Sequence, residues 1–224
     1  MTEDSEPIAD SLSPPDLLTP VDRLRDGKLQ LHLLGFRGSG KSTVGKLVAR
    51  RLLWNFLDLD TLVERAAGRS VAEIFAAAAN EGGRADSSGS DAEEEKLFRE
   101  AEFRRWEQHA LRQAVQKPRT VLALGGGTPI DPDNREISGR AAVTVWLRCS
   151  FETLRTRVTD RETARQGRGG LVVQAVRPLW SSDVKARELY EQRQSVYGLA
   201  DAVVDANNSP DEVAERVCRA VLDD

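Results

Sequence analysis

Short apolar runs alternate with longer amphipathic stretches along this chain. The runs carry hydrophobic side chains at consecutive positions, which is typical of parallel strands buried on both faces. We expect strands at residues 29–34, 54–57, 120–124, 142–147 and 202–204. The stretches between them repeat apolar residues at helical spacing, at 42–53, 61–67, 71–79, 93–116, 151–158, 184–197 and 210–222. This alternation predicts an α/β domain whose parallel sheet is covered by helices on both sides.

Three polar segments lie outside this pattern. Residues 1–28 are rich in Asp, Glu, Ser and Pro and show no sustained period, so we expect a mobile tail. Residues 80–92 are rich in Gly, Ser and Asp, which favours a flexible surface loop. Residues 160–182 form a long connection with a Gly-rich centre, and connections of this length are often disordered or functional lids. Residues 29–224 are therefore expected to form one domain with an insert and a lid.

Composition and charge narrow the class of protein. The 224 residues carry a formal net charge of −4 and are 40% hydrophobic, as in a globular chain without the basic field of a nucleic-acid binder. No apolar run approaches the roughly 18 residues that span a membrane. The acidic N-terminus resembles neither a secretory signal nor a transit peptide. The two cysteines show no disulfide framework or metal-ligand spacing. We expect a cytoplasmic monomer without nucleic-acid or membrane partners.

The strongest chemical signal is Gly-Phe-Arg-Gly-Ser-Gly-Lys-Ser at residues 35–42, which matches the phosphate-loop pattern G-x4-G-K-[ST]. Glycines let backbone N–H groups converge on phosphates, and a helix N-terminus adds positive potential. Lys41 would reach the β- and γ-phosphates, and Ser42 would offer its hydroxyl to Mg²⁺. A Gly-rich turn without a ligand is the alternative, and the position between a strand and a helix argues against it.

Two carboxylates, Asp58 and Asp60, follow the second expected strand. Residues i and i+2 of a strand face the same side, so both can point into the crevice at the C-terminal edge of the sheet. Ligands of open α/β sheets bind at that edge. One carboxylate could order Mg²⁺ while the other holds an acceptor hydroxyl. A helix cap is equally compatible, with Asp60 preceding the helix expected at 61–67.

Weaker features accompany these two. On the helix expected at 93–116, Arg104 and Glu107 share a face with Phe103, Ala110, Leu111 and Ala114. Their spacing favours a surface ion pair, although an arginine held for a substrate carboxylate would show the same pattern. The glycines at 125–127 allow either a close approach to a ligand or a sharp turn. Arginines between 155 and 177, and Arg193, could offset the charge of phosphoryl transfer or be solvated. His32 and His109 are interpreted as structural.

Together and in this order, the motifs resemble those of the shikimate kinase family. The matching segments are GFRGSGKST (35–43), FLDLDTLVERAAGRSVAEIF (56–75), EAEFRRWE (100–107), LGGG (124–127), RPL (177–179), LYEQR (189–193) and VVDANNSP (203–210). The phosphate loop alone indicates only a nucleotide binder, whereas the combination points to one acceptor. The resemblance spans residues 29–222. It implies a three-layer α/β/α fold of the P-loop nucleoside-monophosphate-kinase type, with a five-stranded parallel sheet and a lid.

The resemblance also implies an activity, which is ATP-dependent phosphorylation of the 3-hydroxyl of shikimate, with Mg²⁺ as cofactor, in the pathway to aromatic amino acids. By position it makes Lys41, Asp60 and Arg177 catalytic. It places ATP at Gly38, Ser39, Gly40, Lys41, Ser42, Thr43, Arg157, Arg177 and Pro210, and Mg²⁺ at Ser42 and Asp58. It places shikimate at Asp60, Phe75, Phe103, Arg104, Glu107, Gly125, Gly126, Gly127 and Arg193.

Within this set, the resemblance gives several residues separate roles. Asp60 is the candidate base, and Arg104 and Arg193 clamp the carboxylate of shikimate. Glu107 orients Arg104, and Arg177 is an arginine of the lid that contacts the phosphates. Arg157 and Pro210 would hold adenine, although Arg155 lies only two residues from Arg157 and could take its place in the alignment.

The chain departs from the family pattern in three places. Residues 80–97 are inserted, and Arg99 stands where the family has Gly. The lid is longer than usual, and the N-terminal tail has no counterpart. Another small-metabolite kinase of the same fold, such as a gluconate-kinase-like enzyme, is one alternative function. An inactive nucleotide-binding homologue is the other.

Overall fold

The computed structural model describes residues 30–76, 89–166 and 183–222. Over these ranges the chain forms a five-stranded parallel sheet in the order β2-β3-β1-β4-β5. The strands are β1 (Gln30–Leu34), β2 (Asn55–Asp58), β3 (Thr120–Ala123), β4 (Ala142–Arg148) and β5 (Ala202–Asp205). Each strand boundary within the described residues lies within one position of the expected run. The predicted fold class is confirmed.

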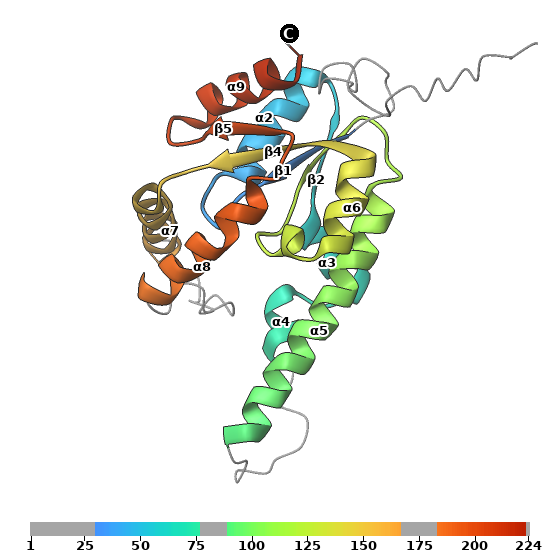
Figure 1. The fold of residues 1–224 in the computed structure, drawn as a ribbon, viewed down its shortest axis with the longest axis vertical. Coiled ribbons are helices and arrows are strands. Elements are labelled where there is room, and N and C mark those ends of the chain that lie inside the picture. The colour runs from blue at the N-terminus through green and yellow to red at the C-terminus, as the bar shows by residue number, and fades with distance from the viewer. Residues whose placement is uncertain (1–29, 77–88, 167–182, 223–224) are drawn as a thin grey trace, which may run out of the picture.

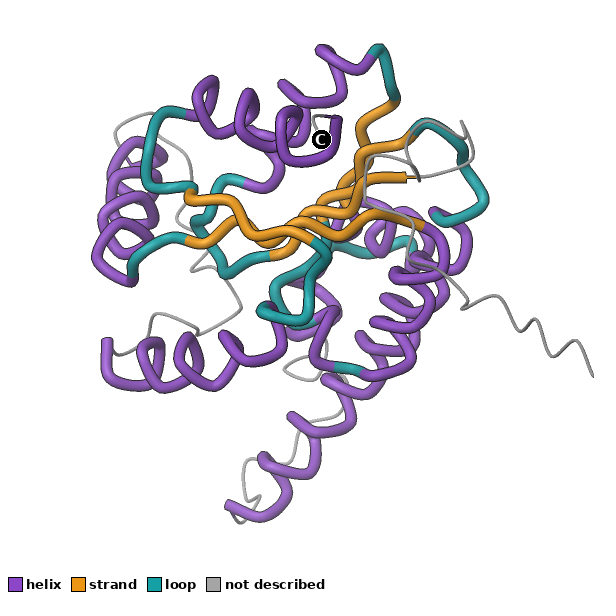
Figure 2. Tube along the Cα trace, turned by 45° about the horizontal axis from the view of Figure 1, so that its top comes forward, coloured by secondary structure: helices purple, strands orange, loops and turns teal. Residues whose placement is uncertain are grey.

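Helices cover both faces of the sheet. They are α2 (Lys41–Leu52), α3 (Leu59–Ala67), α4 (Val71–Ala76), α5 (Gly89–Ala114), α6 (Pro132–Ala141), α7 (Phe151–Gln166), α8 (Asp183–Tyr197) and α9 (Pro210–Leu222), with a short 3₁₀ turn η2 at Thr128–Ile130. Helices α2 and α9 pack together on one face, while α3, α5, α6 and α8 lie on the other (Figures 1 and 2). The N-terminal part of α5 extends away from the sheet beside α4 (Figure 1).

Several helical predictions need correction. Residues 89–92 were expected in a flexible loop but begin α5, and residues 160–166 were expected in the lid but continue α7. Both segments are polar on every side, so they carry no apolar period that marks a helix. The described end of the insert, residues 89–97, is therefore helical. The tail at 1–28, residues 77–88 and the rest of the lid lie outside the described residues.

Helix α6 was not predicted at all, because its sequence PDNREISGRA has only one large apolar residue. The start signals were nevertheless present. Asp131 is the N-cap, and its side chain accepts a hydrogen bond of 2.8 Å from the backbone N–H of Asp133. Pro132 occupies the first turn, where a missing N–H costs nothing. Capping residues would have located this helix where periodicity could not.

The buried strands place the functional motifs at one edge of the sheet. Strands β1 and β3 are buried along their whole length, and β4 is buried up to its last residue. Since all the strands are parallel, their C-terminal ends meet at the same edge. The phosphate loop follows β1, Asp58 ends β2, and Gly125–Gly127 follow β3 by one residue. Motifs that are far apart in the sequence therefore lie next to one another.

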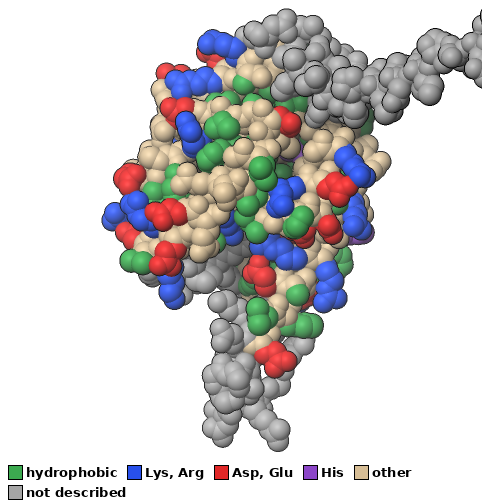
Figure 3. Space-filling view, viewed as in Figure 1, with side chains coloured by type: hydrophobic (Ala, Val, Ile, Leu, Met, Phe, Trp, Pro, Cys, Tyr) green, Lys and Arg blue, Asp and Glu red, His purple; other side chains and the backbone are tan. Residues whose placement is uncertain are grey.

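The face of the molecule shown in Figure 3 carries charges of both signs. Lys and Arg side chains are intermixed with Asp and Glu over the face shown in Figure 3. No helix among residues 30–76, 89–166 and 183–222 is long and apolar enough to cross a membrane.

His32 lies inside the sheet and makes stability depend on pH. Its Nε2 pairs with Gln30 Oε1 at 2.9 Å, and burial lowers the pKa of its imidazole to about 3. The unfolded chain would bind this proton near pH 6.5, so the stabilisation is complete above pH 6.5 and is lost as the pH falls towards 3.

We expect this residue to lower the free energy of unfolding by about 2 kcal/mol between pH 7 and pH 5. His32→Gln, which cannot titrate, should remove that part of the pH dependence whatever its own stability at pH 7. Urea unfolding of both proteins at the two pH values measures the difference. An equal loss in wild type and variant would contradict the prediction.

Candidate active site

The loop between β1 and α2 has the backbone geometry of a phosphate loop. Gly40 has φ 94° and forms the N-cap of α2, a conformation that favours glycine. Gly35 has φ 146°, and a Cβ atom there would lie 2.7 Å from Ser39 Oγ and 2.8 Å from Leu147 O. Ser39 Oγ is itself buried without a hydrogen-bond partner. The loop is therefore closely packed beneath the start of a helix, where anions bind.

Lys41, the first residue of α2, lies across this loop. Its Nζ donates hydrogen bonds to Gly35 O at 2.8 Å and Phe36 O at 3.2 Å. Burial lowers the pKa of the Lys41 ammonium to about 8, although the nearby carboxylates of Asp60 and Asp58 oppose that shift. The lysine thus lies close to both acidic residues. Its ammonium group donates hydrogen bonds to backbone carbonyls, and a bound phosphate could replace these acceptors.

Asp58 connects the second strand to the phosphate loop. One oxygen, Oδ1, accepts a hydrogen bond of 3.1 Å from the backbone N–H of Asp60, so Asp58 is the N-cap of α3. The alternative in which Asp60 caps a helix at 61–67 is therefore wrong, because α3 begins at Leu59. The other oxygen, Oδ2, accepts a hydrogen bond of 2.6 Å from Ser42 Oγ. Together Asp58 and Ser42 form a hydroxyl–carboxylate pair beside the loop.

The Asp60 carboxylate has one buried oxygen that is available to a ligand. Its Oδ1 is buried and has no hydrogen-bond partner among residues 30–76, 89–166 and 183–222. Burying a carboxylate oxygen without a partner costs free energy, so such an atom indicates a site for a ligand. A hydroxyl donor from a bound molecule would satisfy it.

The residues beside the loop also fit a magnesium ion. Carboxylate and hydroxyl oxygens are ligands that Mg²⁺ prefers, and it usually keeps only one or two protein ligands beside phosphates and water. Asp58 and Ser42 supply such a set. Within the described part of the chain no group of three or more His, Cys, Asp or Glu side chains could hold a metal by itself. A metal ion at this place would therefore need phosphate oxygens and water as its remaining ligands.

Arg104 and Glu107 do not form the surface ion pair that their spacing favoured. Glu107 Oε2 accepts a hydrogen bond of 2.6 Å from Arg104 Nη1, and the Glu107 side chain is only 1% exposed. Its other oxygen accepts a hydrogen bond of 2.6 Å from Thr128 Oγ1. Burial by itself would lower the pKa of the Arg104 guanidinium, but the carboxylates of Glu107 and Glu100 outweigh it and raise the pKa. The buried carboxylate of Glu107 therefore holds a partly exposed Arg104.

The glycine turn after β3 brings this pair to Asp60. A Cβ atom on Gly125 would lie 2.8 Å from Glu107 Oε1 and 3.3 Å from Asp60 Oδ1. A Cβ atom on Gly127 would lie 2.5 Å from Arg104 Nη2. A Cβ atom at either position would therefore meet side chains from α3 and α5 that already occupy the space.

The middle glycine of the turn connects the acceptor side to the phosphate loop. A Cβ atom on Gly126 would lie 3.4 Å from Arg193 Nη1 and 3.6 Å from Gly35 O. Arg193 in α8 also places its Cζ 5.7 Å from the centre of the Phe36 ring. Tyr197, one turn after Arg193, donates a hydrogen bond of 2.6 Å to Gly126 O. Helix α8 is thus fastened to the glycine turn.

The aromatic residues assigned to the pocket wall differ in exposure. The Phe75 and Phe103 rings are 5.3 Å apart between centroids. Phe103 has no exposed surface, so it supports Phe75 and lies under Arg104 at 5.4 Å from Cζ to the ring centre. Phe75 is half-buried. Only Phe75 has surface that a ligand could contact in this conformation.

Where we expect the nucleotide, Arg157 of α7 binds the loop that precedes Pro210. Arg157 Nη2 donates hydrogen bonds to Asn207 O at 3.2 Å and Asn208 O at 2.9 Å. Those residues lead directly to Pro210, the first residue of α9. Arg157 is therefore positioned beside the loop that carries Pro210.

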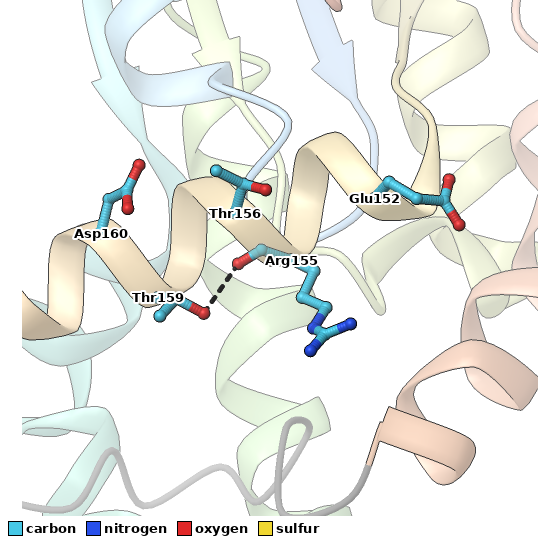
Figure 4. Close-up of a pocket in the computed structure, with 5 residues that line it drawn as sticks. All are labelled: Glu152, Arg155, Thr156, Thr159 and Asp160. Atoms are coloured by element: carbon cyan, nitrogen blue, oxygen red, sulfur yellow. Dashed lines mark hydrogen bonds between the residues drawn. The ribbon is translucent and has the colours of Figure 1, made fainter.

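Arg155 points elsewhere. It forms an ion pair with Asp183 in α8, with 3.2 Å between Nε and Oδ2. It also lines a cavity of about 310 Å³ along α7. Figure 4 shows its side chain there, together with Glu152, Thr156, Thr159 and Asp160. This geometry favours Arg157 over Arg155 as the residue at the end of the nucleotide site.

Sequence reasoning missed three residues of the site. Thr128 holds Glu107, Tyr197 holds the glycine turn, and Glu100 contacts Arg104. Tyr197 and Glu100 each lie four positions from a predicted arginine, which is a neighbouring position on a helix and could have identified them. Arg177 and the RPL segment, by contrast, lie outside the described residues.

Gly127 provides a direct test of this arrangement. Its φ of −96° suits any residue, so Gly127→Ala adds no backbone strain, and any loss of stability comes from a weakened pair between Arg104 and Glu107. The new methyl group would displace the Arg104 guanidinium, and a misplaced binding group can cost tenfold or more. We expect the KM for the acceptor to rise about tenfold. Gly139→Ala, where no atom lies within 4 Å of the new methyl group, is the matched control. Steady-state kinetics that do not differ between the two variants would contradict the prediction.

Comparison with known proteins finds matches over most of this chain. A family model described as shikimate kinase matches residues 37–89 and 93–222. The shikimate kinase of Microcystis aeruginosa is 34% identical over 198 residues, which are 86% of this chain and 86% of the relative. That of Lactococcus lactis subsp. lactis is 33% identical over 191 residues, which are 84% of this chain and 96% of the relative.

A solved structure is similar over a comparable length. Shikimate kinase from Acinetobacter baumannii in complex with shikimate is 25% identical, with a TM-score of 0.67 over 89% of this chain and 96% of that one. The match of the family model extends from the phosphate loop to the last helix. The predicted resemblance is confirmed, and this chain belongs to the shikimate kinase family.

Proposed function

We propose that this chain transfers the γ-phosphoryl group of ATP to the 3-hydroxyl of shikimate. One observation carries the proposal. The glycine turn at Gly125–Gly127 lies against Asp60, Arg104 and Arg193 and also against Gly35 of the phosphate loop. An acceptor site and a phosphate site therefore open onto each other. The relative from Acinetobacter baumannii, solved in complex with shikimate, supports the choice of acceptor.

The phosphate loop supplies the nucleotide site. Backbone N–H groups of Gly38, Ser39 and Gly40, with Ser42 and Thr43 at the start of α2, would hold the β- and γ-phosphates. Arg157 and Pro210 would enclose the adenine. Lys41, whose present hydrogen bonds are to loop carbonyls, would turn its ammonium to the transferring phosphoryl group. Asp58 and Ser42 would hold Mg²⁺, which neutralises phosphate charge when it is bound. We also propose that Arg177 contacts the phosphates from the lid.

Arginines and one carboxylate supply the acceptor site. Shikimate is a small anion that carries several hydroxyl groups. Arg104, held by Glu107, and Arg193 would bind its carboxylate, because guanidinium groups suit carboxylates best. Asp60 would accept a hydrogen bond from the attacking hydroxyl through the oxygen that now has no partner, which holds the hydroxyl in line with the phosphorus. The glycine turn would contact the ring hydroxyls, with Phe75, and Phe103 behind it, as the wall.

Phosphoryl transfer requires little covalent catalysis by the protein. Positioning of the reactants and stabilisation of charge provide most of the rate enhancement. The site contains both. Asp60 orients the nucleophile, and Lys41 with the arginines offsets the negative charge that shifts to the leaving group.

A coupled ADP-release assay tests the proposal with shikimate, gluconate and nucleoside monophosphates as acceptors. We expect turnover with shikimate only. Preferred turnover of gluconate would favour the gluconate-kinase-like alternative, and ATP binding without any turnover would favour an inactive homologue. Omitting Mg²⁺ should abolish the activity. We further propose a monomer that works in the cytoplasm, and sedimentation velocity would reveal a larger assembly.

A further inference from the structure

The Arg104 guanidinium is contacted by two carboxylates of very different character. Glu107 is buried at 1% exposure and is bonded on its other oxygen to Thr128. Glu100, one turn earlier in α5, is 49% exposed. Its Oε1 accepts hydrogen bonds from Arg104 Nη2 at 2.6 Å and from Nε at 3.0 Å. One carboxylate is fixed in the interior, and the other reaches the guanidinium from the surface.

The third side of the guanidinium faces the glycine turn. A Cβ atom on Gly127 would lie 2.5 Å from Nη2, 2.8 Å from Nη1 and 3.0 Å from Cζ of Arg104. Because such an atom is nearer to both nitrogens than to the central carbon, it approaches the edge of the group and not its face. The edge formed by Nη1 and Nη2 therefore lies against Gly127, with too little room for even a methyl group between them.

The edges of the guanidinium are thus all engaged. Glu107 binds Nη1, Gly127 lies against the end formed by Nη1 and Nη2, and Glu100 takes the edge formed by Nε and Nη2. That last edge is one on which a planar carboxylate can bind with two parallel hydrogen bonds. An acceptor carboxylate that binds Arg104 in this geometry must take the place of Glu100.

Charge supports the same conclusion. Two carboxylates already surround one guanidinium, so a third would meet like charge unless one leaves. Glu107 stays bound to Arg104, because its buried carboxylate would otherwise have no counter-charge. Glu100 can move into water at little cost, because exposed ion pairs four positions apart on a helix are weak.

We propose that Glu100 is an internal competitor for the acceptor carboxylate and thereby a specificity-determining residue. It occupies the binding edge of Arg104 in the free enzyme and moves to solvent when an acidic acceptor binds. A neutral polyol lacks the charge to displace Glu100, so the Nε–Nη2 edge of Arg104 stays occupied and the polyol cannot bind there. This selects against neutral acceptors. This inference rests on the proposed function, since it takes shikimate as the acidic acceptor.

The full chain with Glu100→Gln tests the proposal, because the side chain keeps its size and loses its charge. We expect the KM for shikimate to fall about threefold to tenfold, while kcat and the KM for ATP stay unchanged. Because Glu100 is exposed, we expect the variant to fold like the wild type. Glu215→Gln, which removes an exposed pair of the same spacing with Arg219 at 2.7 Å on α9, is the matched control and should leave every constant unchanged.

A neutral ligand separates competition from a general effect. The carboxamide of shikimate should bind weakly to both wild type and Glu100→Gln, with no comparable gain in the variant, as measured by calorimetry. A gain equal to that of shikimate would overturn the proposal. An unchanged KM for shikimate would overturn it, and a raised KM would do so as well, since Glu100 would then support Arg104 instead of competing. Turnover of shikimate by the wild type is measured first and bears on the proposed function alone.

Discussion

Lys41→Met is expected to lower kcat by about 10²- to 10³-fold, because the transferring phosphoryl group loses a positive charge that stabilises it during transfer. The methionine side chain fills a similar volume, and the lysine makes only two hydrogen bonds to loop carbonyls, so the fold should persist. The ADP-release assay under saturating shikimate and ATP measures kcat.

Lys46→Met, on an exposed position of the same helix, is the control for Lys41. Its ammonium lies 5.7 Å from the centre of the Phe56 ring and not over the phosphate loop, so activity should change little. Equal kcat values for the two variants would remove Lys41 from the catalytic residues. The calorimetric affinity for ATP, measured in parallel, distinguishes weaker nucleotide binding from slower transfer.

Arg104→Lys is expected to raise the KM for shikimate about 10- to 100-fold while the KM for ATP changes little. A lysine keeps a positive charge beside Glu107 but cannot present the paired donors of a guanidinium, and a hydrogen bond to a charged group is worth about 1.5–3 kcal/mol. The lysine variant is preferable to Arg104→Ala, which would leave Glu107 buried without a counter-charge and could unfold the protein.

Arg105→Lys is the natural control for this experiment, because the neighbouring side chain is exposed on the same helix. It should leave both KM values unchanged. If Arg104→Lys bound shikimate as well as wild type, the Arg104–Glu107 pair would be a structural ion pair only, and the acceptor site would have to lie elsewhere.

The two predictions probe opposite sides of one feature. The parallel strands end at a common edge, and the glycine turn after β3 closes the gap between them. Lys41 represents the phosphate side and Arg104 the acceptor side, with Gly126 in contact range of Gly35 and Arg193. A kinase of this type needs both sites within in-line distance, and the shared sheet edge with its two glycine-containing loops supplies that proximity.

The elements differed in how far their sequences revealed them. Strands β1, β3 and β4 were found within one residue, because segments buried on both faces must be apolar at every position. Helix α6 and the ends of α5 and α7 escaped, because polar helices carry no period and their stability comes from caps and neighbours. Within the site, the phosphate loop was recognisable since its function depends on consecutive residues.

The sequence by itself determined what local chemistry can encode: the strand positions, the glycine conformations of the phosphate loop, and the acidic pair at Asp58 and Asp60. The tertiary structure alone decided that Glu107 is buried and not a surface partner, that one oxygen of Asp60 lacks a partner, and that Glu100 occupies an edge of Arg104. The physical reason is that burial and hydrogen-bond satisfaction depend on residues distant along the chain, such as Thr128 and the glycine turn. Spacing along one helix is the same for an exposed ion pair and for a buried one, and only packing distinguishes them.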